Sequence, residues 1–128
     1  MPHRFPIRVY YEDTDMAGIV YYANYLRYIE RARSDWVRGL GIDQRALRED
    51  GVVFAVRRVE ADYLQPARFD DALEVQTETR GATGARLTLF QQVWRGETLL
   101  FRAEVVIVCL GPSGQPLRLP ANMRRVPG

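Results

Sequence analysis

The chain has no lysine, one cysteine and one histidine. Cys109 lacks a second cysteine with which to form an internal disulfide or a cysteine metal cluster. His3 lies near the amino terminus, in a segment expected to be mobile, so a Ser-His-Asp or Cys-His arrangement and a histidine-ligated zinc site have no credible base or ligands. The sequence shows no secretory leader and no apolar run long enough to cross a bilayer, so we expect a cytoplasmic protein without a transmembrane segment.

The chain carries almost no excess of either positive or negative charge. The 18 basic residues, all arginine, face 16 acidic ones, which leaves a formal net charge of +2. That excess is too small to favour nucleic acid, although the planar fork of arginine suits phosphate and leaves a phosphate-bearing ligand open. With 128 residues, 47% of them hydrophobic and 27% charged, the composition predicts one folded domain over 1–128.

The first third of the chain predicts a strand followed by a long helix. Residues 7–11 alternate apolar and polar side chains, the period of a half-buried strand. Between Asn24 and Gly39 apolar side chains recur every three or four residues, which predicts an amphipathic helix about 25 Å long. We expect Asn24 to cap this helix and Asp43 to cap a shorter one over 43–49.

The rest of the chain predicts strands joined by tight turns. The strand that begins near Phe54 changes phase, so we expect a bulge near Arg57. Three further strands are expected at 73–78, 87–93 and 101–110. The last is apolar on both faces and should be central, whereas 112–128 is rich in proline and glycine and should lie over the surface. The predicted class is α+β, with one antiparallel sheet of about five strands curled around one long helix.

Aromatic side chains are numerous for a domain of this size. Those expected on the surface are Phe54, Tyr63, Phe90, Trp94 and Phe101. A single helix covers only one face of a sheet, so the other face is solvated or meets a second subunit. This favours a homo-oligomer.

The stretch YYEDTDMAGIVYYAN, residues 10–24, places three carboxylates where the first strand gives way to the long helix. Gly18 allows a sharp turn there. Backbone N–H groups near a helix start can satisfy Asp15 in a cap or Asx turn, the commoner role of aspartate, or they can stabilise an oxyanion on a substrate. Both interpretations stay open. The ligand spacing of an EF-hand is absent after Asp15, and we expect no metal.

Other candidate groups have simpler structural interpretations. Cys109 lies in the most apolar strand and is expected to be buried rather than nucleophilic. Glu30 could point inward as a base, but an ion-pair network on the helix is favoured, with Arg27, Arg31 and Arg33. Asp70 and Asp71 are typical of a turn that opens a strand.

Three stretches of the chain carry a family resemblance: VYYEDTDMAGIVYYANYLRYIERAR, VVFAVRRVEADYLQPARFDDALEVQTE and AEVVIVC. In order and spacing they resemble the 4-hydroxybenzoyl-CoA thioesterase family of hotdog-fold acyl-CoA thioesterases, in its YbgC-like branch associated with the bacterial Tol-Pal cell-envelope system. The resemblance implies a hotdog fold, in which a curved sheet wraps one long helix. It also implies that subunits join sheets edge to edge as a homodimer or homotetramer.

The resemblance further implies hydrolysis of acyl-CoA to free acid and coenzyme A, with no cofactor because coenzyme A is part of the substrate. Asp15 matches the catalytic carboxylate, as nucleophile or general base, and the backbone amide of Tyr22 matches the oxyanion donor. Residues expected against the substrate are Gly18, Val20, Tyr25, Arg80 and Arg86. The two arginines flank the GATGA turn and would contact the nucleotide. Acyl carrier protein is a second candidate partner.

Position 22 separates two branches of the family. Many YbgC-like sequences have histidine where this chain has Tyr22, whereas the 4-hydroxybenzoyl-CoA enzyme has tyrosine. The expected acyl group is therefore short-chain aliphatic or aromatic, similar to 4-hydroxybenzoyl. Two alternatives stay open: a module that binds acyl-CoA or acyl carrier protein without cleaving it, and a hotdog hydratase, which commonly needs a histidine dyad that His3 alone does not supply.

Overall fold

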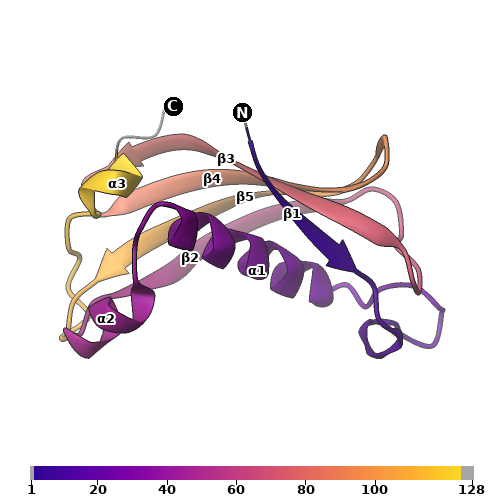
Figure 1. Cartoon of the computed structure of the whole chain (residues 1–128), viewed down its shortest axis with the longest axis horizontal. Coiled ribbons are helices and arrows are strands. Elements are labelled where there is room, and N and C mark those ends of the chain that lie inside the picture. Colours follow the sequence, from indigo (N-terminus) through magenta and orange to yellow (C-terminus); the bar gives the residue numbers. More distant parts are fainter. Residues whose placement is uncertain (1, 125–128) are drawn as a thin grey trace.

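A computed structural model describes residues 2–124 of the chain. A five-stranded antiparallel sheet arches over one long helix, as predicted, with strand order β1-β3-β4-β5-β2 (Figure 1). The strands are β1 (His3–Arg8), β2 (Val53–Tyr63), β3 (Ala72–Thr83), β4 (Arg86–Arg95) and β5 (Thr98–Leu110). The helices are the 3-10 helix η1 (Tyr11–Asp13), α1 (Asn24–Gly39), α2 (Gln44–Glu49) and α3 (Ala121–Arg124).

The sheet contains the predicted strands, although β3 runs on to Thr83, beyond the expected end at 78, and β5 begins at Thr98, ahead of the expected start at 101. The bulge expected near Arg57 is the register change between Val56 and Arg58 in the β2–β5 pairing. β5 has a neighbour on each side, although β4 is the middle strand. The first strand is displaced: it was expected over 7–11 but ends at Arg8, because the Asp13 carboxylate accepts the Tyr10 N–H and turns the chain into η1.

The apolar stripe of α1 packs against the sheet as the periodicity predicts. Its buried residues are Tyr25, Tyr28, Ile29, Ala32, Trp36 and Val37. Beneath them, the fully buried Gln91 of β4 donates to the Ile29 carbonyl and accepts from Arg33 Nη1, both at 2.9 Å. Arg33 thus bonds to the sheet, and over 2–124 no ion pair joins Glu30 to the arginines expected beside it.

The start of α1 is held by Asp13 and not by an asparagine cap. The N-cap position is Ala23, and the Asn24 side chain donates instead to the Asp13 carbonyl at 2.9 Å. The hydroxyl of Tyr28, one turn into the helix, donates to Asp13 Oδ2 at 3.0 Å. One residue therefore fastens the connection from β1 to the first turn of α1. The other predicted cap is confirmed, since Asp43 accepts two N–H bonds at the start of α2.

Most of the carboxy-terminal segment up to residue 124 lies over the surface as predicted, but Leu119 and Met123 reach the core. The Leu119 N–H donates to the Gly84 carbonyl at 3.0 Å, and the chain then turns into α3. Leu119 and Met123 lie four residues apart across this turn and are both buried. Residues 125–128, the end of the predicted surface segment, lie outside the described part of the chain.

Two further expectations are corrected by the fold. His3 is an ordered part of β1, and its Nε2 lies 2.8 Å from Asp35 Oδ2 on α1. Phe101, expected on the surface, is fully buried in β5, whereas Tyr63 at the end of β2 is about half exposed. Cys109 is buried as predicted, and burial raises the pKa of its thiol, which fits an inert side chain.

Met123 gives a test of the core role of the carboxy-terminal segment. Met123→Ala leaves a cavity where a buried side chain was and should lower the free energy of unfolding by about 2–4 kcal/mol. Met16 is fully exposed, so Met16→Ala is a matched control that should leave stability nearly unchanged. Urea unfolding followed by circular dichroism measures both. Equal stability of the two variants would contradict the packing described for α3.

Tyr28 predicts how stability depends on alkaline pH. Burial and the adjacent Asp13 carboxylate raise the pKa of Tyr28 above its ordinary value of 10.0. The folded state then holds the proton more tightly than the unfolded chain, so this contribution is complete below pH 10 and is lost as the pH rises further. Urea unfolding at about pH 8 and about pH 11 should show a smaller loss of stability for Tyr28→Phe than for wild type.

The exposed Tyr11 supplies the control for this measurement. Tyr11→Phe removes a hydroxyl that lies in solvent, so its alkaline loss of stability should equal that of wild type. The account of Tyr28 fails if Tyr28→Phe and wild type lose the same free energy between the two pH values.

Candidate active site

Asp15 opens a tight turn between η1 and α1, and residues 15–18 are called the Asp15 turn below. The Asp15 N–H donates to the Ile19 carbonyl and the Gly18 N–H donates to the Asp15 carbonyl, each at 2.9 Å. Gly18 has a φ of 79°, in the left-handed region that favours glycine. Asp15 Oδ1 accepts the Ala17 N–H at 2.9 Å, which makes an Asx turn. The common structural role of aspartate is therefore present, and it uses one carboxylate oxygen.

Asp15 and Asp13 differ in the hydrogen bonds that their second carboxylate oxygen, Oδ2, accepts. Asp15 is exposed, and its Oδ2 accepts no hydrogen bond from any residue between 2 and 124. Asp13 is half-buried, with Oδ2 bound to both Tyr10 and Tyr28. Two carboxylates two residues apart thus have different environments: Asp13 holds the connection together, and Asp15 keeps an oxygen available for chemistry.

Tyr22 carries a backbone donor that the fold leaves free. The neighbouring Tyr21 N–H donates to the Asp13 carbonyl at 2.9 Å, and the Asn24 N–H donates to the Tyr21 carbonyl at 2.8 Å. The Tyr22 N–H has no acceptor in the described chain, while its carbonyl accepts the Tyr63 hydroxyl at 3.0 Å. A free amide ahead of the first turn of a helix lies where the helix dipole favours negative charge.

A cavity of about 320 Å³ lies next to the Asp15 turn. Its lining is mostly apolar and aromatic: Ile19, Val20, Tyr22, Tyr25, Tyr63, Leu64, Gln65 and Pro66. Ile19 connects the two features, since its carbonyl holds the Asp15 N–H. The volume is at the small end of the roughly 300–1,000 Å³ of ligand pockets. The structure thus brings the predicted residues Val20, Tyr22 and Tyr25 together along one wall, with Asp15 and Gly18 in the adjoining turn.

Tyr25 forms a rigid inner wall of this cavity. Its ring stacks on Phe101 with centroids 5.0 Å apart and meets Tyr63 edge-on at 5.4 Å. Its hydroxyl oxygen accepts the Ala67 N–H at 3.0 Å. Burial is the main cause that raises the pKa of Tyr25, so the phenol stays neutral at physiological pH.

Other hollows lie away from the Asp15 turn. One of about 330 Å³ lies between α1 and β2, and two of about 440 and 400 Å³ flank α2. Asp43 lines one of these, but its carboxylate caps α2 through the N–H groups of Arg45 and Ala46. Size therefore does not identify the site. The cavity lined by Ile19 and Tyr22 stands out because Tyr22 carries a free amide, and because Ile19 is bonded to the backbone of Asp15, whose Oδ2 is free.

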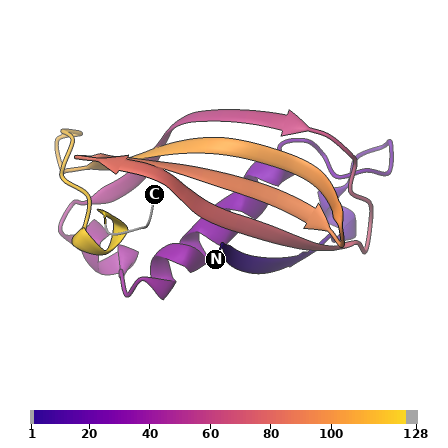
Figure 2. The ribbon, with the colours of Figure 1, turned by 90° about the horizontal axis from the view of Figure 1, so that it is seen from above.

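Arg80 and Arg86 are not near Asp15 in the same chain. They lie at the β3–β4 hairpin, at the opposite end of β3 from the residue that pairs with Arg8 before the Asp15 turn (Figure 2). The 12 residues of β3 separate the two ends by roughly 36 Å, taking about 3.3 Å per residue. Arg80 pairs with Glu78 at 3.5 Å and covers the Phe90 ring, whereas Arg86 is exposed.

The residues that sequence reasoning missed come from the β2–β3 connection, 64–71. Leu64, Gln65 and Pro66 line the cavity, and the turn expected at Asp70 and Asp71 closes the connection, with Asp70 at a φ of 68°. The quoted stretch ADYLQPARFDD contains all of them, yet nothing in its composition shows that it returns to the strand-to-helix junction. The Ala67 carbonyl does so, by accepting the Val20 N–H.

Residues 2–124 contain no cluster of three or more His, Cys, Asp or Glu side chains arranged to hold a metal ion. A membrane-spanning helix is likewise not found among the helices of this part of the chain, none of which has the necessary length and apolar character.

Comparison with known proteins places this geometry in a family. The model of the thioesterase-like superfamily matches residues 9–126. The acyl-CoA thioester hydrolase YbgC of Escherichia coli O6:H1 is 44% identical over 122 residues, which cover 94% of this chain and 91% of the relative. The acyl-CoA thioesterase YbgC of Haemophilus influenzae is 41% identical over 123 residues, covering 94% and 90%.

Solved structures agree with the sequence relatives. A probable thioesterase from Bartonella henselae superposes with a TM-score of 0.90 at 36% identity, covering 94% of this chain and 100% of that one. A 1,4-dihydroxy-2-naphthoyl-CoA thioesterase from Synechocystis gives a TM-score of 0.88 at 25% identity, covering 95% and 92%. The chain therefore belongs to the thioesterase-like superfamily and is a thioester hydrolase of its hotdog-fold, YbgC-like branch.

Proposed function

We propose that the chain hydrolyses acyl-CoA thioesters to free acid and coenzyme A, with Asp15 as the reacting carboxylate. The observation that carries this proposal is that one short segment holds the free Oδ2 of Asp15 and the free N–H of Tyr22, and that Tyr22 lines a cavity together with Ile19, whose carbonyl accepts the Asp15 N–H. The YbgC relatives match this chain over most of its length and are acyl-CoA thioesterases, which supports the same chemistry at the same place in the fold.

The proposed reaction needs one carboxylate and one oxyanion donor. The thioester carbonyl oxygen accepts the Tyr22 N–H, and Asp15 either attacks the carbonyl carbon or removes a proton from an attacking water. Negative charge moves to the carbonyl oxygen, where the amide dipole stabilises it. The carbon–sulfur bond then breaks, and coenzyme A leaves as its thiolate. Where Asp15 is the nucleophile, water then hydrolyses the acyl–Asp15 anhydride, which releases the free acid and restores the carboxylate. Histidine takes no part, because His3 is bound to Asp35 on α1.

The acyl group is proposed to be short-chain aliphatic or aromatic, as in 4-hydroxybenzoyl-CoA. A cavity of about 320 Å³ holds a small group, and its tyrosine rings offer faces and edges to an aromatic acyl group. The structurally similar Synechocystis protein is a 1,4-dihydroxy-2-naphthoyl-CoA thioesterase, and the acyl group of that substrate is also aromatic. The tyrosine at position 22 adds one of the rings that line the cavity.

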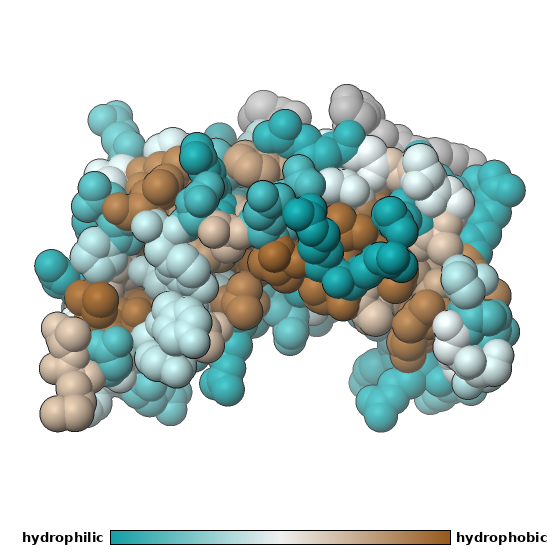
Figure 3. Space-filling model, turned by 180° about the vertical axis from the view of Figure 1, so that it is seen from behind, coloured by the Kyte–Doolittle hydropathy of each residue, from teal (hydrophilic) through white to brown (hydrophobic). Residues whose placement is uncertain are grey.

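A homodimer joined along β2 is proposed to complete the site. β2 is an edge strand with exposed apolar side chains at Val53, Val56, Val59 and Tyr63. Figure 3 shows that side of the molecule, where hydrophobic and hydrophilic residues interleave. Antiparallel pairing of two β2 strands about Val59 places Arg58 of each protomer opposite Glu60 of the other, so opposite charges meet across the axis. Pairing also covers an edge that would otherwise invite aggregation.

Assembly also bears on how coenzyme A is held. Arg80 and Arg86 lie too far from Asp15 within one chain, so we propose that they contact the nucleotide of a substrate bound to another protomer, in the dimer or in a tetramer of two dimers. The buried single cysteine fits a cytoplasmic location, where free coenzyme A esters and acyl carrier protein both occur.

The alternative function is a module that binds acyl-CoA without cleaving it. It shares the cavity and differs only in the fate of the thioester. Release of free thiol from acetyl-, hexanoyl- and benzoyl-CoA separates the two: thiol release supports hydrolysis, and saturable binding with no release supports the module.

Asp15→Asn is the direct test of the carboxylate. The amide side chain keeps the Asx turn but neither attacks nor takes a proton, so kcat should fall by about 10²–10⁴-fold with the fold unchanged. Glu12→Gln is the matched control, since it removes an exposed carboxylate three residues away and should retain wild-type turnover. Thiol release under saturating substrate measures both. Near-normal kcat in Asp15→Asn would remove Asp15 from the mechanism.

Val59→Arg tests the dimer along β2. The arginine introduced at position 59 would lie opposite the same arginine of the other protomer, and the two like charges would repel each other. The variant should therefore sediment as a monomer and lose most of its turnover. Leu26→Arg on α1, also an exposed apolar side chain, should remain a dimer with normal turnover. Analytical ultracentrifugation gives the oligomeric state. A dimeric Val59→Arg, or a monomeric Leu26→Arg, would place the interface elsewhere.

A further inference from the structure

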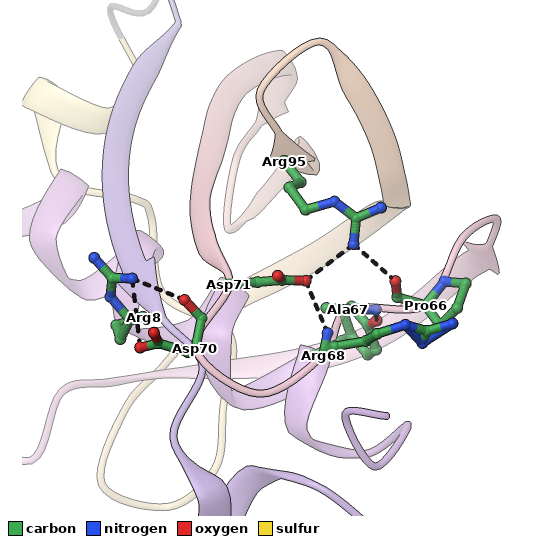
Figure 4. Close-up of polar contacts among 8 residues, drawn as sticks. Arg8, Pro66, Ala67, Arg68, Asp70, Asp71 and Arg95 are labelled. Atoms are coloured by element: carbon green, nitrogen blue, oxygen red, sulfur yellow. Dashed lines mark hydrogen bonds and ion pairs between the residues drawn. The ribbon is translucent and has the colours of Figure 1, made fainter. Parts of the chain in front are cut away.

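An ion pair fixes the β2–β3 connection next to Pro66, one of the residues that line the cavity (Figure 4). Arg95, the last residue of β4, donates from Nη1 to Asp71 Oδ2 at 2.9 Å and to the Pro66 carbonyl at 3.1 Å. The same Asp71 oxygen accepts the Arg68 N–H at 2.9 Å. The ion pair is therefore hydrogen-bonded to the backbone on both sides of Ala67, at Pro66 and at Arg68.

Ala67 passes this constraint to the site. It is fully buried, its N–H donates to the Tyr25 hydroxyl at 3.0 Å, and its carbonyl accepts the Val20 N–H at 2.8 Å. A bridge pairs Arg68 with Ile19, whose carbonyl holds the Asp15 N–H. Residues 66–68 are thus engaged by Arg95 and Asp71 on one side. On the other side they are bonded to Ile19, Val20 and Tyr25, and Ile19 connects them to the Asp15 turn.

The neighbouring ion pair has no such connection. Arg8 Nη1 lies 3.6 Å from Asp70 Oδ1 and donates to the Asp70 carbonyl at 2.7 Å, on the opposite side of the same turn (Figure 4). Its side chains are 54% and 72% exposed, against 38% and 24% for Arg95 and Asp71. The less exposed pair is less screened by solvent and holds its geometry better.

We propose that Arg95 and Asp71 are positioning residues for thioester hydrolysis. They act through residues 66–68, which set the place of Val20 and hence of the Asp15 carboxylate and the Tyr22 amide relative to each other. The inference rests on the proposed function. Because a displacement of about 1 Å between reacting groups lowers rates by about 10²-fold, a clamp of this kind affects turnover more than it affects folding.

The kinetic test compares variants of the two ion pairs in the full chain. Arg95→Gln and Asp71→Asn should each lower kcat for benzoyl-CoA by about 10-fold or more, with smaller changes in KM, since the reacting groups are displaced while the cavity remains. Arg95→Lys should recover most of kcat, because one ammonium can replace the single Nη1 that makes both contacts. Arg8→Gln, the matched control, should keep wild-type kcat. Circular dichroism and thermal melting confirm that each variant is folded at the assay temperature.

Amide hydrogen exchange gives a readout that does not depend on catalysis. The Val20 and Ala67 amides should exchange at least about 10-fold faster in Arg95→Gln and Asp71→Asn than in wild type, and at the wild-type rate in Arg8→Gln and Arg95→Lys. Faster exchange only at residues 66–68, with Val20 unchanged, would overturn the coupling to the site.

The two proposals fail in different ways. If wild type releases thiol while Arg95→Gln and Asp71→Asn keep wild-type kcat, the positioning role is wrong and the proposed function stands. If wild type releases no thiol from any acyl-CoA, the proposed function is wrong, and the exchange rate of Val20 alone decides whether the ion pair positions the Asp15 turn.

Discussion

The geometry of the candidate site depends on the hydrogen bonds made by one half-buried residue, Asp13. Asp13 Oδ2 accepts from the backbone of Tyr10 and the hydroxyl of Tyr28, and its carbonyl accepts from Asn24 and Tyr21. These four contacts join the end of β1 to the first turn of α1, so the residues between them have little freedom. Asp15 and Tyr22 lie within that closed segment. Within it, Asp15 Oδ2 and the Tyr22 N–H are free, since the contacts that close the segment are made by Asp13.

Much of the fold was predictable because periodicity reflects burial directly. The stripe from Tyr25 to Val37 and the alternation in β3 each have one apolar face, and a phase change in β2 marked its bulge. The errors come from contacts between distant segments. Leu119 and Met123 are two apolar residues in a proline-rich segment, and only the space left beside the β3–β4 hairpin makes them core. No local pattern carries that information.

The candidate site was predictable only in part, because some of its contacts also join distant segments. Residues 10–24 showed by themselves that carboxylates meet backbone donors, but they did not show that Asp13 also binds the hydroxyl of Tyr28, which lies on the helix, while Asp15 stays exposed. The resemblance, not the pattern, selected Asp15. Arg95 and Asp71 had no local signal at all, since the contacts that connect them to the site pass through Ala67 to Val20, which lies 47 residues earlier in the chain.

The proposed active site and the proposed dimer interface lie next to each other at the end of β2. Tyr63 is the last residue of that edge strand, lines the cavity, and donates to the carbonyl of Tyr22, whose N–H is the proposed oxyanion donor. A partner strand along β2 would therefore lie beside the cavity and reduce its exposure to water. Exclusion of water strengthens the interaction of the amide dipole with a developing oxyanion. The proposed pairing would thus cover aromatic surface and favour the reaction at the same place, so dimer formation and turnover should rise together.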